Sequence, residues 1–343
     1  MSVFIIAEAG VNHNNDANIA IEMVETAKRC GADAVKFQTF MAEKLITPGT
    51  EMADYQRKQV GPGDQYTLLK ELELSAELHQ QLFDHCSALN IEFMSTPFDE
   101  QSADFLIKLG MTKIKISSGE ITNEPFLAFL AEKGLPILLS TGMATMPEVH
   151  RAVQVIKEAR NRTGHKEPLS ERLTLLHCTS NYPARCEDVH LRAMQIMASE
   201  TNLSVGYSDH TRGVVVSTAA VALGATVIEK HFTLDKNLKG PDHQASLLPE
   251  ELFQLVHHIR MVESALGLPI KQPCADEFSV RALVRRSVVL IKPVQAAQKI
   301  EREDITLLRP GTGISPAEFK AVIGKRAMRD LPVNTVLQWS DLS

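Results

Sequence analysis

The strongest constraint on the fold is an alternation of short apolar runs with longer segments that carry apolar residues at helical spacing. The runs predict eight strands: Val3–Ala7, Ala34–Phe37, Ile91–Met94, Lys113–Ile116, Pro136–Leu139, Leu173–Leu176, Leu203–Gly206 and Thr226–Glu229. Successive runs are never only a hairpin turn apart, so the strands should be parallel. Parallel strands that alternate with helices predict a (β/α)8 TIM barrel, an α/β fold whose strand ends meet at one rim. Polar residues follow the runs and would collect there: Glu8, Lys36, Ser95, Lys115, Ser140, His177, Ser208 and His231.

The chain length leaves room for a small domain after the barrel. A barrel takes about 250 residues, and the chain has 343. The last predicted barrel helix ends near Leu266. We assign residues 1–275 to the barrel, 276–285 to a linker and 286–343 to a small β-rich domain. About 58 residues make a marginal core, so this domain should bury a face against another surface.

A long polar insertion interrupts the pattern between Phe40 and Glu71. It contains Pro48-Gly49 and Gly61-Pro62-Gly63, which are turn sequences. Loops of this length in compact domains are usually functional. We expect a lid over the barrel mouth, with a disordered insertion as the alternative.

Composition argues against several classes of protein. The net charge is −6 and the only basic cluster is small, which argues against nucleic-acid binding. The five cysteines have no CxxC spacing, which argues against a disulfide framework or zinc cluster. The sequence has neither an export signal nor a run approaching the roughly 18 apolar residues of a membrane span. We therefore expect a cytoplasmic protein without a membrane partner.

Two histidines follow the last two predicted strands. His210 comes after Ser208-Asp209, and His231 comes after Glu229-Lys230. Adjacent strands lie about 4.8 Å apart, so the two imidazoles can share one divalent ion that water or substrate oxygens complete as a Lewis acid. A pair of hydrogen-bonded rim histidines is the alternative.

Two lysines end strands between apolar neighbours. Lys36 and Lys115 would bring ammonium groups into the barrel mouth, where they need an anion. Hydroxyl groups near the same rim can donate to phosphate oxygens: Thr96, Ser118, Ser140, Ser180 and Ser208. Together these residues predict a small phosphorylated substrate. The alternative is that the lysines pair with structural carboxylates such as Glu120 or Glu229.

Two further carboxylates suggest roles in the chemistry. Glu8 ends the first strand, where its surroundings can tune its pKa for moving a proton or positioning water. A salt bridge to one of the lysines is the alternative. Asp242 lies in a loop after His231, where it can bind hydroxyl groups or simply cap a turn.

Ten short motifs run through the barrel region in order. They are Ala7-Glu8-Ala9-Gly10-Val11-Asn12-His13, Val35-Lys36-Phe37-Gln38-Thr39, Ser95-Thr96-Pro97-Phe98, Lys115-Ile116-Ser117-Ser118-Gly119-Glu120, Ser140-Thr141-Gly142-Met143, His177-Cys178-Thr179, Tyr182-Pro183, Ser208-Asp209-His210, Glu229-Lys230-His231-Phe232-Thr233 and Gly240-Pro241-Asp242-His243. The tail contains Arg309-Pro310-Gly311-Thr312-Gly313-Ile314. In these motifs the whole chain resembles the sialic acid synthase, or nonulosonate synthase, family, whose members end in an antifreeze-like (SAF) domain.

This resemblance implies a C–C bond-forming transferase of sialic acid biosynthesis. Phosphoenolpyruvate would condense with water and an open-chain N-acetylmannosamine-type sugar, and phosphate would leave with C–O cleavage. His210 and His231 would bind Mn²⁺ or Mg²⁺, and Glu8 would be the acid/base or water-positioning carboxylate. Implied phosphoenolpyruvate ligands are Lys36, Thr96, Lys115, Ser118, Ser140, Ser180 and Ser208. Implied sugar ligands are Gln38, Glu120, Tyr182 and Asp242.

The resemblance also implies a domain-swapped homodimer, in which Arg309 reaches the acyl group of a sugar in the partner's barrel. Gly240-Pro241-Asp242-His243 favours the sialic or legionaminic branches of the family. We predict an N-acetylneuraminate synthase, with a legionaminate synthase acting on 2,4-diacetamido-2,4,6-trideoxymannose as the alternative.

Two other functions fit the residue pattern less well. A Schiff-base aldolase that uses a lysine such as Lys115 would be trapped by borohydride and would survive chelation. A non-enzymatic carbohydrate-binding protein would bind a ligand without releasing phosphate.

Overall fold

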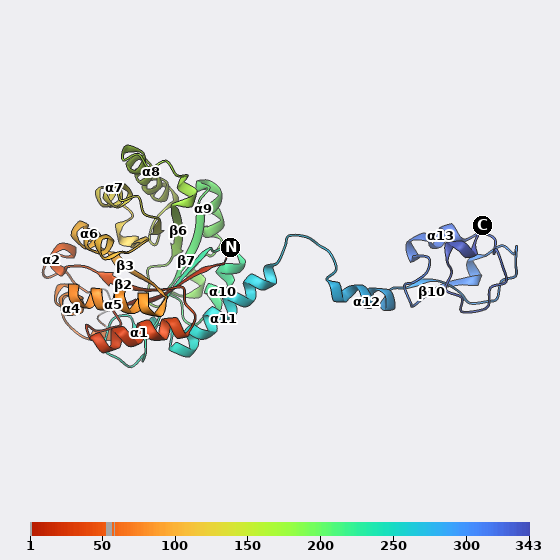
Figure 1. The fold of residues 1–343 in the computed structure, drawn as a ribbon, viewed down its shortest axis with the longest axis horizontal. Coiled ribbons are helices and arrows are strands. Elements are labelled where there is room, and N and C mark those ends of the chain that lie inside the picture. Colours follow the sequence, from red (N-terminus) through yellow and green to blue (C-terminus); the bar gives the residue numbers. More distant parts are fainter. Residues whose placement is uncertain (1, 53–56, 58) are drawn as a thin grey trace. The chain divides into compact units, whose positions relative to one another are not determined.

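The computed structural model describes residues 2–52, 57 and 59–343, and it divides into two compact units. The first unit is Met1–Gly267 and the second is Leu268–Ser343 (Figure 1). Among the described residues, no helix combines the length and apolar character that crossing a membrane requires.

The first unit confirms the predicted TIM barrel. Its parallel strands are β1 (Phe4–Gly10), β2 (Ala34–Thr39), β3 (Glu92–Pro97), β4 (Ile114–Ile116), β5 (Ile137–Ser140), β6 (Leu173–Cys178), β7 (Ser204–Asp209) and β8 (Val227–His231). They pair in the order β3-β2-β1-β8-β7-β6-β5-β4. The two ends of this order, β3 and β4, also contact each other, which closes the barrel.

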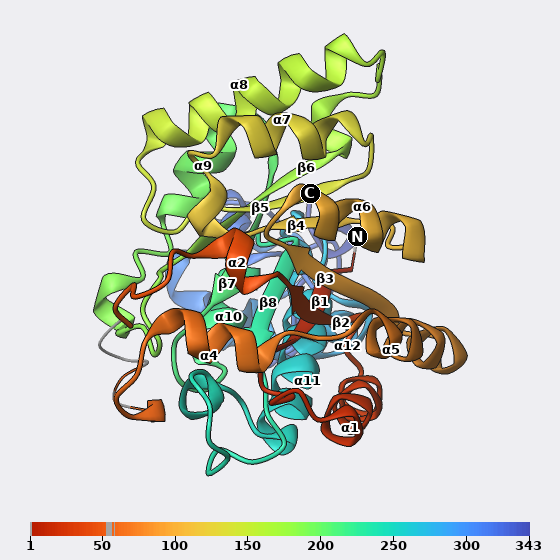
Figure 2. The same ribbon diagram turned by 90° about the vertical axis from the view of Figure 1, so that its left-hand side faces the viewer.

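Helices surround the strands (Figure 2). They are α1 (Ala17–Arg29), α2 (Ala42–Leu45), α4 (Gln65–Leu72), α5 (Ala76–Leu89), α6 (Glu100–Leu109), α7 (Glu124–Glu132), α8 (Met146–Arg162), α9 (Ala193–Thr201), α10 (Val215–Ala222) and α11 (Pro249–Leu266). Short 3₁₀ turns are η1 (Ser118–Glu120), η2 (Leu169–Glu171), η3 (Cys186–Asp188) and η4 (His243–Ala245).

Capping side chains fix where several helices begin. The side chains of Asp16, Ser75 and Asp99 accept hydrogen bonds from backbone N–H groups in the first turns of α1, α5 and α6. These residues satisfy donors that a helix start leaves unpaired. These three helices therefore begin at defined places in the chain.

Alternation along the strands builds two apolar layers. In β1, Ile5 and Ala7 belong to the core between strands and helices, whereas Ile6 belongs to a small cluster inside the barrel. The other buried members of that inner cluster are Ala34, Met94, Leu138, Leu176 and Val227. Residues two positions further along a strand point the same way. Glu8 therefore points into the barrel above Ile6, and the same rule places Lys36, Thr96, Ser140 and Glu229 above the inner layer. Ser95 and His177, which were also expected at the rim, are offset by one position and point the other way: Ser95 Oγ lies 2.6 Å from Thr39 Oγ1, and His177 Nε2 donates to the Val189 carbonyl at 2.6 Å.

The second unit is the small domain with antiparallel pairing. Its β9 (Ser287–Leu290) pairs with β10 (Ile305–Leu308), and its helices are α12 (Ala275–Val284) and α13 (Phe319–Val322). Its 3₁₀ turns are η5 (Arg302–Asp304), η6 (Pro316–Glu318) and η7 (Trp339–Asp341). A separate core holds it together, formed around Val288, Leu290, Ile300, Ile305 and Leu337.

The predicted linker, 276–285, lies almost wholly in α12. The boundary between the two compact units lies before the predicted linker, between Gly267 and Leu268. The helix begins with a capping box, in which the Glu277 carboxylate accepts a hydrogen bond from the Cys274 backbone N–H at 2.9 Å. None of its residues is buried, and it carries exposed apolar side chains at Phe278, Val280, Leu283 and Val284.

Candidate active site

A cavity of about 490 Å³ opens at the carboxyl ends of the barrel strands. Every predicted site residue of the barrel lines it: Glu8, Lys36, Gln38, Thr96, Lys115, Ser118, Glu120, Ser140, Ser180, Tyr182, Ser208, His210, His231 and Asp242. Arg309 belongs to the second unit, where its side chain is exposed.

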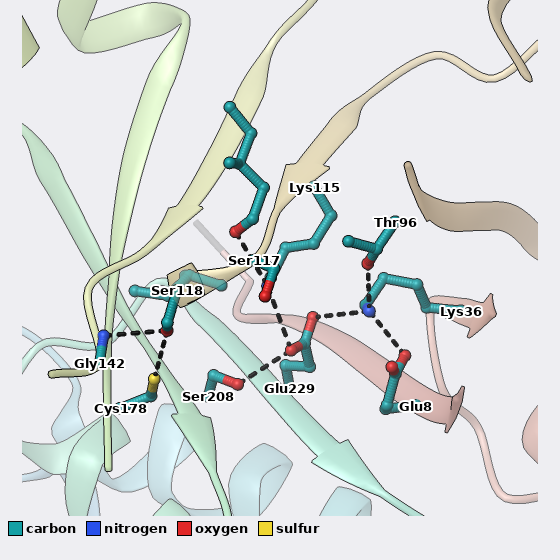
Figure 3. A network of polar contacts seen from close by, with 12 residues as sticks. Glu8, Lys36, Thr96, Lys115, Ser117, Ser118, Gly142, Cys178, Ser208 and Glu229 are labelled. Atoms are coloured by element: carbon teal, nitrogen blue, oxygen red, sulfur yellow. Dashed lines mark hydrogen bonds and ion pairs between the residues drawn. The ribbon is translucent and has the colours of Figure 1, made fainter. Parts of the chain in front are cut away.

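Four charged side chains form the floor of this cavity: Glu8, Lys36, Lys115 and Glu229 (Figure 3). The Lys36 Nζ lies 2.7 Å from Glu8 Oε2 and 3.6 Å from Glu229 Oε2, and it donates a hydrogen bond to Thr96 Oγ1 at 2.8 Å. All four residues are at most 5% exposed. Two lysines and two carboxylates therefore neutralise each other where their side chains are almost fully buried.

Glu229 lies between the two lysines. Its Oε1 is 3.6 Å from Lys115 Nζ and accepts a hydrogen bond from Ser208 Oγ at 2.9 Å. Glu8 and Glu229 therefore both form ion pairs with the lysines, as the alternatives in the sequence analysis predicted. Glu120 does not take part, because its carboxylate accepts a hydrogen bond from Asn123 Nδ2 at 2.7 Å instead.

The two carboxylates have opposite pKa shifts. Burial raises the pKa of Glu8 to about 7, against the opposing charge of Lys36 and with support from the nearby Glu229 carboxylate. Burial would also raise the pKa of Glu229, but Lys115 and Lys36 outweigh it and lower that pKa to about 2. Glu229 therefore stays ionised, whereas Glu8 can exchange a proton near neutral pH, as a general acid or base requires.

The lysines respond differently to the same surroundings. Burial opposes the ammonium form of Lys36, but the carboxylates of Glu229 and Glu8 outweigh it and raise its pKa. Burial lowers the pKa of Lys115, which Glu229 offsets only in part. Glu229 is thus the main charge that keeps Lys115 protonated.

Hydroxyl groups line the cavity on another side, and the Gly142 backbone lies close to one of them. Ser118 Oγ accepts a hydrogen bond from the Gly142 backbone N–H at 2.9 Å and lies 3.0 Å from Cys178 Sγ. A Cβ added at Gly142 would lie 2.8 Å from Ser118 Oγ, so only glycine allows this approach. Ser140 Oγ is buried without a hydrogen-bond partner. An unpaired buried hydroxyl in a cavity that also holds two lysines is suited to an anionic ligand.

Two histidines and a tyrosine form another side of the cavity. The ring centroids of His210 and His231 are 5.6 Å apart, and the Tyr182 ring lies 4.1 Å from that of His210. Gly10, with φ +54°, leaves the space beside His231, since a Cβ there would lie 3.2 Å from its Cε1. Burial lowers the pKa of His210 to about 4 and lowers that of His231 well below its usual value, so both rings are neutral at pH 7.

The two histidines have the properties of metal ligands. His210 Nδ1 donates to the Thr179 carbonyl at 2.8 Å, which leaves its Nε2 with a lone pair. His231 Nδ1 is buried without a hydrogen-bond partner and lies 4.0 Å from Asp242 Oδ2. Two neutral imidazoles with uncommitted nitrogens fit a divalent cation. In the described part of the chain no three His, Cys, Asp or Glu side chains form a cation site, so further ligands would be water or substrate.

The residues assigned to the sugar lie around these groups. Gln38 Nε2 donates to Glu8 Oε1 at 3.3 Å. Asp242 is 8% exposed, and burial raises its pKa to about 6. Its backbone carbonyl accepts the Ser246 hydroxyl at 2.7 Å, so the residue also stabilises its turn while its carboxylate faces the cavity.

The predicted insertion contributes two short helices, α2 and α4, that pack against each other. Leu45 and Ile46 from the end of α2, together with Leu68, Leu69 and Leu72 of α4, line the cavity. Residues 53–56 and 58 of the predicted lid lie outside the described residues.

Sequence reasoning missed two features of the site. Glu229 was considered only as a structural carboxylate, although it precedes His231 by two positions on β8 and so points the same way. The alternation of side chains along this strand could have indicated that Glu229 belongs to the site. The apolar residues of the insertion gave no indication, because α2 has only 4 residues and α4 only 8.

Comparisons with known proteins agree with this architecture. The model of the NeuB family matches residues 23–271, and that of the SAF domain matches residues 285–343. The N,N'-diacetyllegionaminic acid synthase of Legionella pneumophila is 52% identical over 343 residues, which cover 100% of this chain and 95% of the relative. The N-acetylneuraminate-9-phosphate synthase of Mus musculus is 35% identical over 327 residues, or 95% of this chain and 88% of the relative. A crystal structure of the N-acetylneuraminic acid synthetase of Leptospira borgpetersenii, bound to citrate, superposes with a TM-score of 0.71 at 34% identity, covering 82% of this chain and 90% of that one.

Proposed function

The chain belongs to the NeuB family of nonulosonate synthases and ends in a SAF domain, and from this membership we propose that it is an N,N'-diacetyllegionaminic acid synthase. The observation that carries the proposal is the 52% identity to a synthase of that name along the whole chain. The mammalian sialic acid synthase is less similar, at 35% identity. The legionaminate alternative is therefore better supported than the N-acetylneuraminate synthase that the motifs alone favoured.

In the proposed reaction, the enol carbon of phosphoenolpyruvate attacks the aldehyde of 2,4-diacetamido-2,4,6-trideoxymannose. Water adds at the neighbouring carbon, the bond from that carbon to the bridging oxygen breaks, and phosphate leaves with this oxygen. The product is a nine-carbon 2-keto acid.

The charged floor suits the first substrate. Lys36 and Lys115 bind the phosphate and carboxylate of phosphoenolpyruvate, and hydroxyl groups complete its contacts: Thr96, Ser118, Ser140, Ser180 and Ser208. Ammonium and hydroxyl donors in a water-poor cavity bind anions more strongly than they would in water. Glu229 holds both lysines in their charged form while the ester is absent.

Glu8 is the proposed acid/base group. Its pKa of about 7 gives it both protonation states near neutral pH, so it can take a proton from the attacking water and return one later. When bound to His210 and His231, Mn²⁺ or Mg²⁺ supplies Lewis acidity at the aldehyde oxygen. Asp242, Gln38, Glu120 and Tyr182 bind and orient the sugar.

We extend the proposal to the assembly. Arg309 of the SAF domain reaches the acyl group of a sugar held in the partner's barrel, in a domain-swapped homodimer. Sedimentation velocity tests this, because a monomeric protein with full activity would contradict it.

Phosphate release tests the function. The purified protein with Mn²⁺ and phosphoenolpyruvate should release phosphate faster with the diacetamido sugar than with N-acetylmannosamine. Phosphoenolpyruvate labelled with ¹⁸O in its bridging position should pass the label to phosphate, whereas P–O cleavage would leave it in the keto acid. A lysine trapped by borohydride with pyruvate would instead indicate a Schiff-base aldolase, and sugar binding without phosphate release would indicate a carbohydrate-binding protein.

A further inference from the structure

The cavity has a second side whose chemistry differs from that of the floor. Seven apolar side chains line this side and form one cluster, which we call the apolar wall: Val11, Phe40, Leu45, Leu68, Leu69, Leu72 and Phe98. Four of them belong to α2 and α4 of the insertion. The strands therefore supply charges, and the insertion supplies hydrocarbon.

The apolar wall is separate from the barrel core. Its residues form their own cluster, and they do not appear in the core between strands and helices. Leu45, Leu68 and Leu69 remain only partly buried while they line the cavity. Apolar area left facing a cavity favours a ligand that covers it with apolar groups.

Phosphoenolpyruvate has little apolar surface with which to cover the apolar wall, and its charged groups require the lysines of the floor. The sugar is the substrate that can cover it. A 2,4-diacetamido-2,4,6-trideoxy sugar carries a methyl group at carbon 6 and the methyl of an acetamido group at carbon 4. N-acetylmannosamine has hydroxyl groups at both positions, and these would lose hydrogen bonds to water against hydrocarbon.

We propose that the apolar wall is the specificity determinant of this enzyme, and that Leu45 and Leu69 select a 6-deoxy, 4-acylamino sugar over a 4,6-dihydroxy sugar. This inference rests on the proposed function for the identity of the reaction. It adds which residues choose the sugar and by which chemical groups. Discrimination through apolar contacts of this size is worth about 10- to 200-fold per methyl or methylene group.

The test compares a polar and an apolar change at the same position. Leu69→Asn keeps the approximate size of the side chain but adds an amide, whereas Leu69→Met stays apolar. We expect Leu69→Asn to lower the ratio of kcat/KM for the diacetamido sugar to that for N-acetylmannosamine by about tenfold or more. Leu69→Met should leave the ratio near wild type, and the KM for phosphoenolpyruvate should not change in either variant.

Further variants separate specificity from folding. Leu45→Asn repeats the test from the other helix, and Leu266→Asn is the matched control because Leu266 is 55% exposed at the end of α11. Circular dichroism checks that each variant is folded. An equal loss for both sugars in the two wall variants would assign Leu45 and Leu69 a structural role and overturn the inference.

A binding measurement tests the role of the apolar wall separately from the proposed reaction. The affinities of both sugars are measured by calorimetry with inorganic phosphate present, for wild type and Leu69→Asn. If the wild type releases no phosphate with either sugar, the proposed function fails. The inference then still stands if Leu69→Asn loses affinity only for the diacetamido sugar, and it fails if the affinity ratio of the two sugars is unchanged.

Discussion

Replacing Glu229 by glutamine should destabilise the barrel, because this change removes the charge that lies between two buried ammonium groups. Glu229 Oε1 and Oε2 each lie 3.6 Å from a lysine Nζ, and the residue is 5% exposed. Removing one partner of a buried ion pair typically costs about 3–5 kcal/mol. Glu8 still compensates Lys36, so we expect the lower end, about 3 kcal/mol. At roughly 2–4 °C per kcal/mol for a domain of this size, the Tm should fall by about 6–12 °C.

The control for this prediction is Glu92→Gln. Glu92 Oε2 lies 2.6 Å from Lys113 Nζ, but these two side chains are 23% and 31% exposed. A pair that is open to solvent to this extent contributes about 1 kcal/mol or less, so Glu92→Gln should lower the Tm by no more than about 2–4 °C. Thermal unfolding is measured with and without phosphoenolpyruvate, which should stabilise Glu229→Gln more than wild type because its negative charge replaces the lost carboxylate. A Glu229→Gln protein that melts at the wild-type temperature would refute the charge balance described above.

Three other measurements test the site. Because the pKa of Glu8 is raised from 4.5 to about 7, the folded protein holds a proton that the unfolded chain loses in this range. The free energy of unfolding of wild type relative to Glu8→Gln should therefore fall by about 3 kcal/mol as pH rises from 4.5 to 7, which denaturant titrations at several pH values measure. Gly142→Ala should raise the KM for phosphoenolpyruvate by about fivefold or more in initial-rate assays, since its Cβ would crowd Ser180 Oγ, Cys178 Sγ and Ser118 Oγ at a cost of about 1–3 kcal/mol; an unchanged KM would remove Ser118 and Ser180 from the phosphate contacts. EDTA should abolish turnover and Mn²⁺ or Mg²⁺ should restore it, but not in His210→Ala or His231→Ala, and activity that survives EDTA would exclude the proposed metal.

The barrel was predictable because its physical cause is local in the sequence. Buried parallel strands require continuous apolar runs, and such runs are visible without any knowledge of contacts. The strand ends were less accurate: the seventh strand was predicted as Leu203–Gly206, whereas β7 extends to Asp209. Apolar character stops where side chains reach the cavity, but the backbone ladder continues through Ser208 and Asp209.

Most residues that line the cavity were predictable from the sequence, whereas the ion pairs and hydrogen bonds between them were not. Strand ends converge in a barrel, so polar residues that point inward after the runs had to meet; Ser95 and His177 were expected among them but do not line the cavity. Which carboxylate meets which lysine depends on register: Glu8 is paired with Lys36 across β1 and β2, and Ser208 with Glu229 across β7 and β8. Register is set by packing of the whole barrel, and a single sequence does not display it.

Two carboxylates facing two ammonium groups leave the floor of the barrel mouth close to electroneutral before any substrate arrives. In the proposed reaction, a phosphate ester with a carboxylate then adds at least two negative charges among side chains that are almost fully buried. Glu8 has a pKa of about 7, and the incoming anion would raise its proton affinity further. Binding of the ester should thus be accompanied by uptake of a proton from the solvent at Glu8. The substrate would in this way protonate the group that acts as an acid in the later steps.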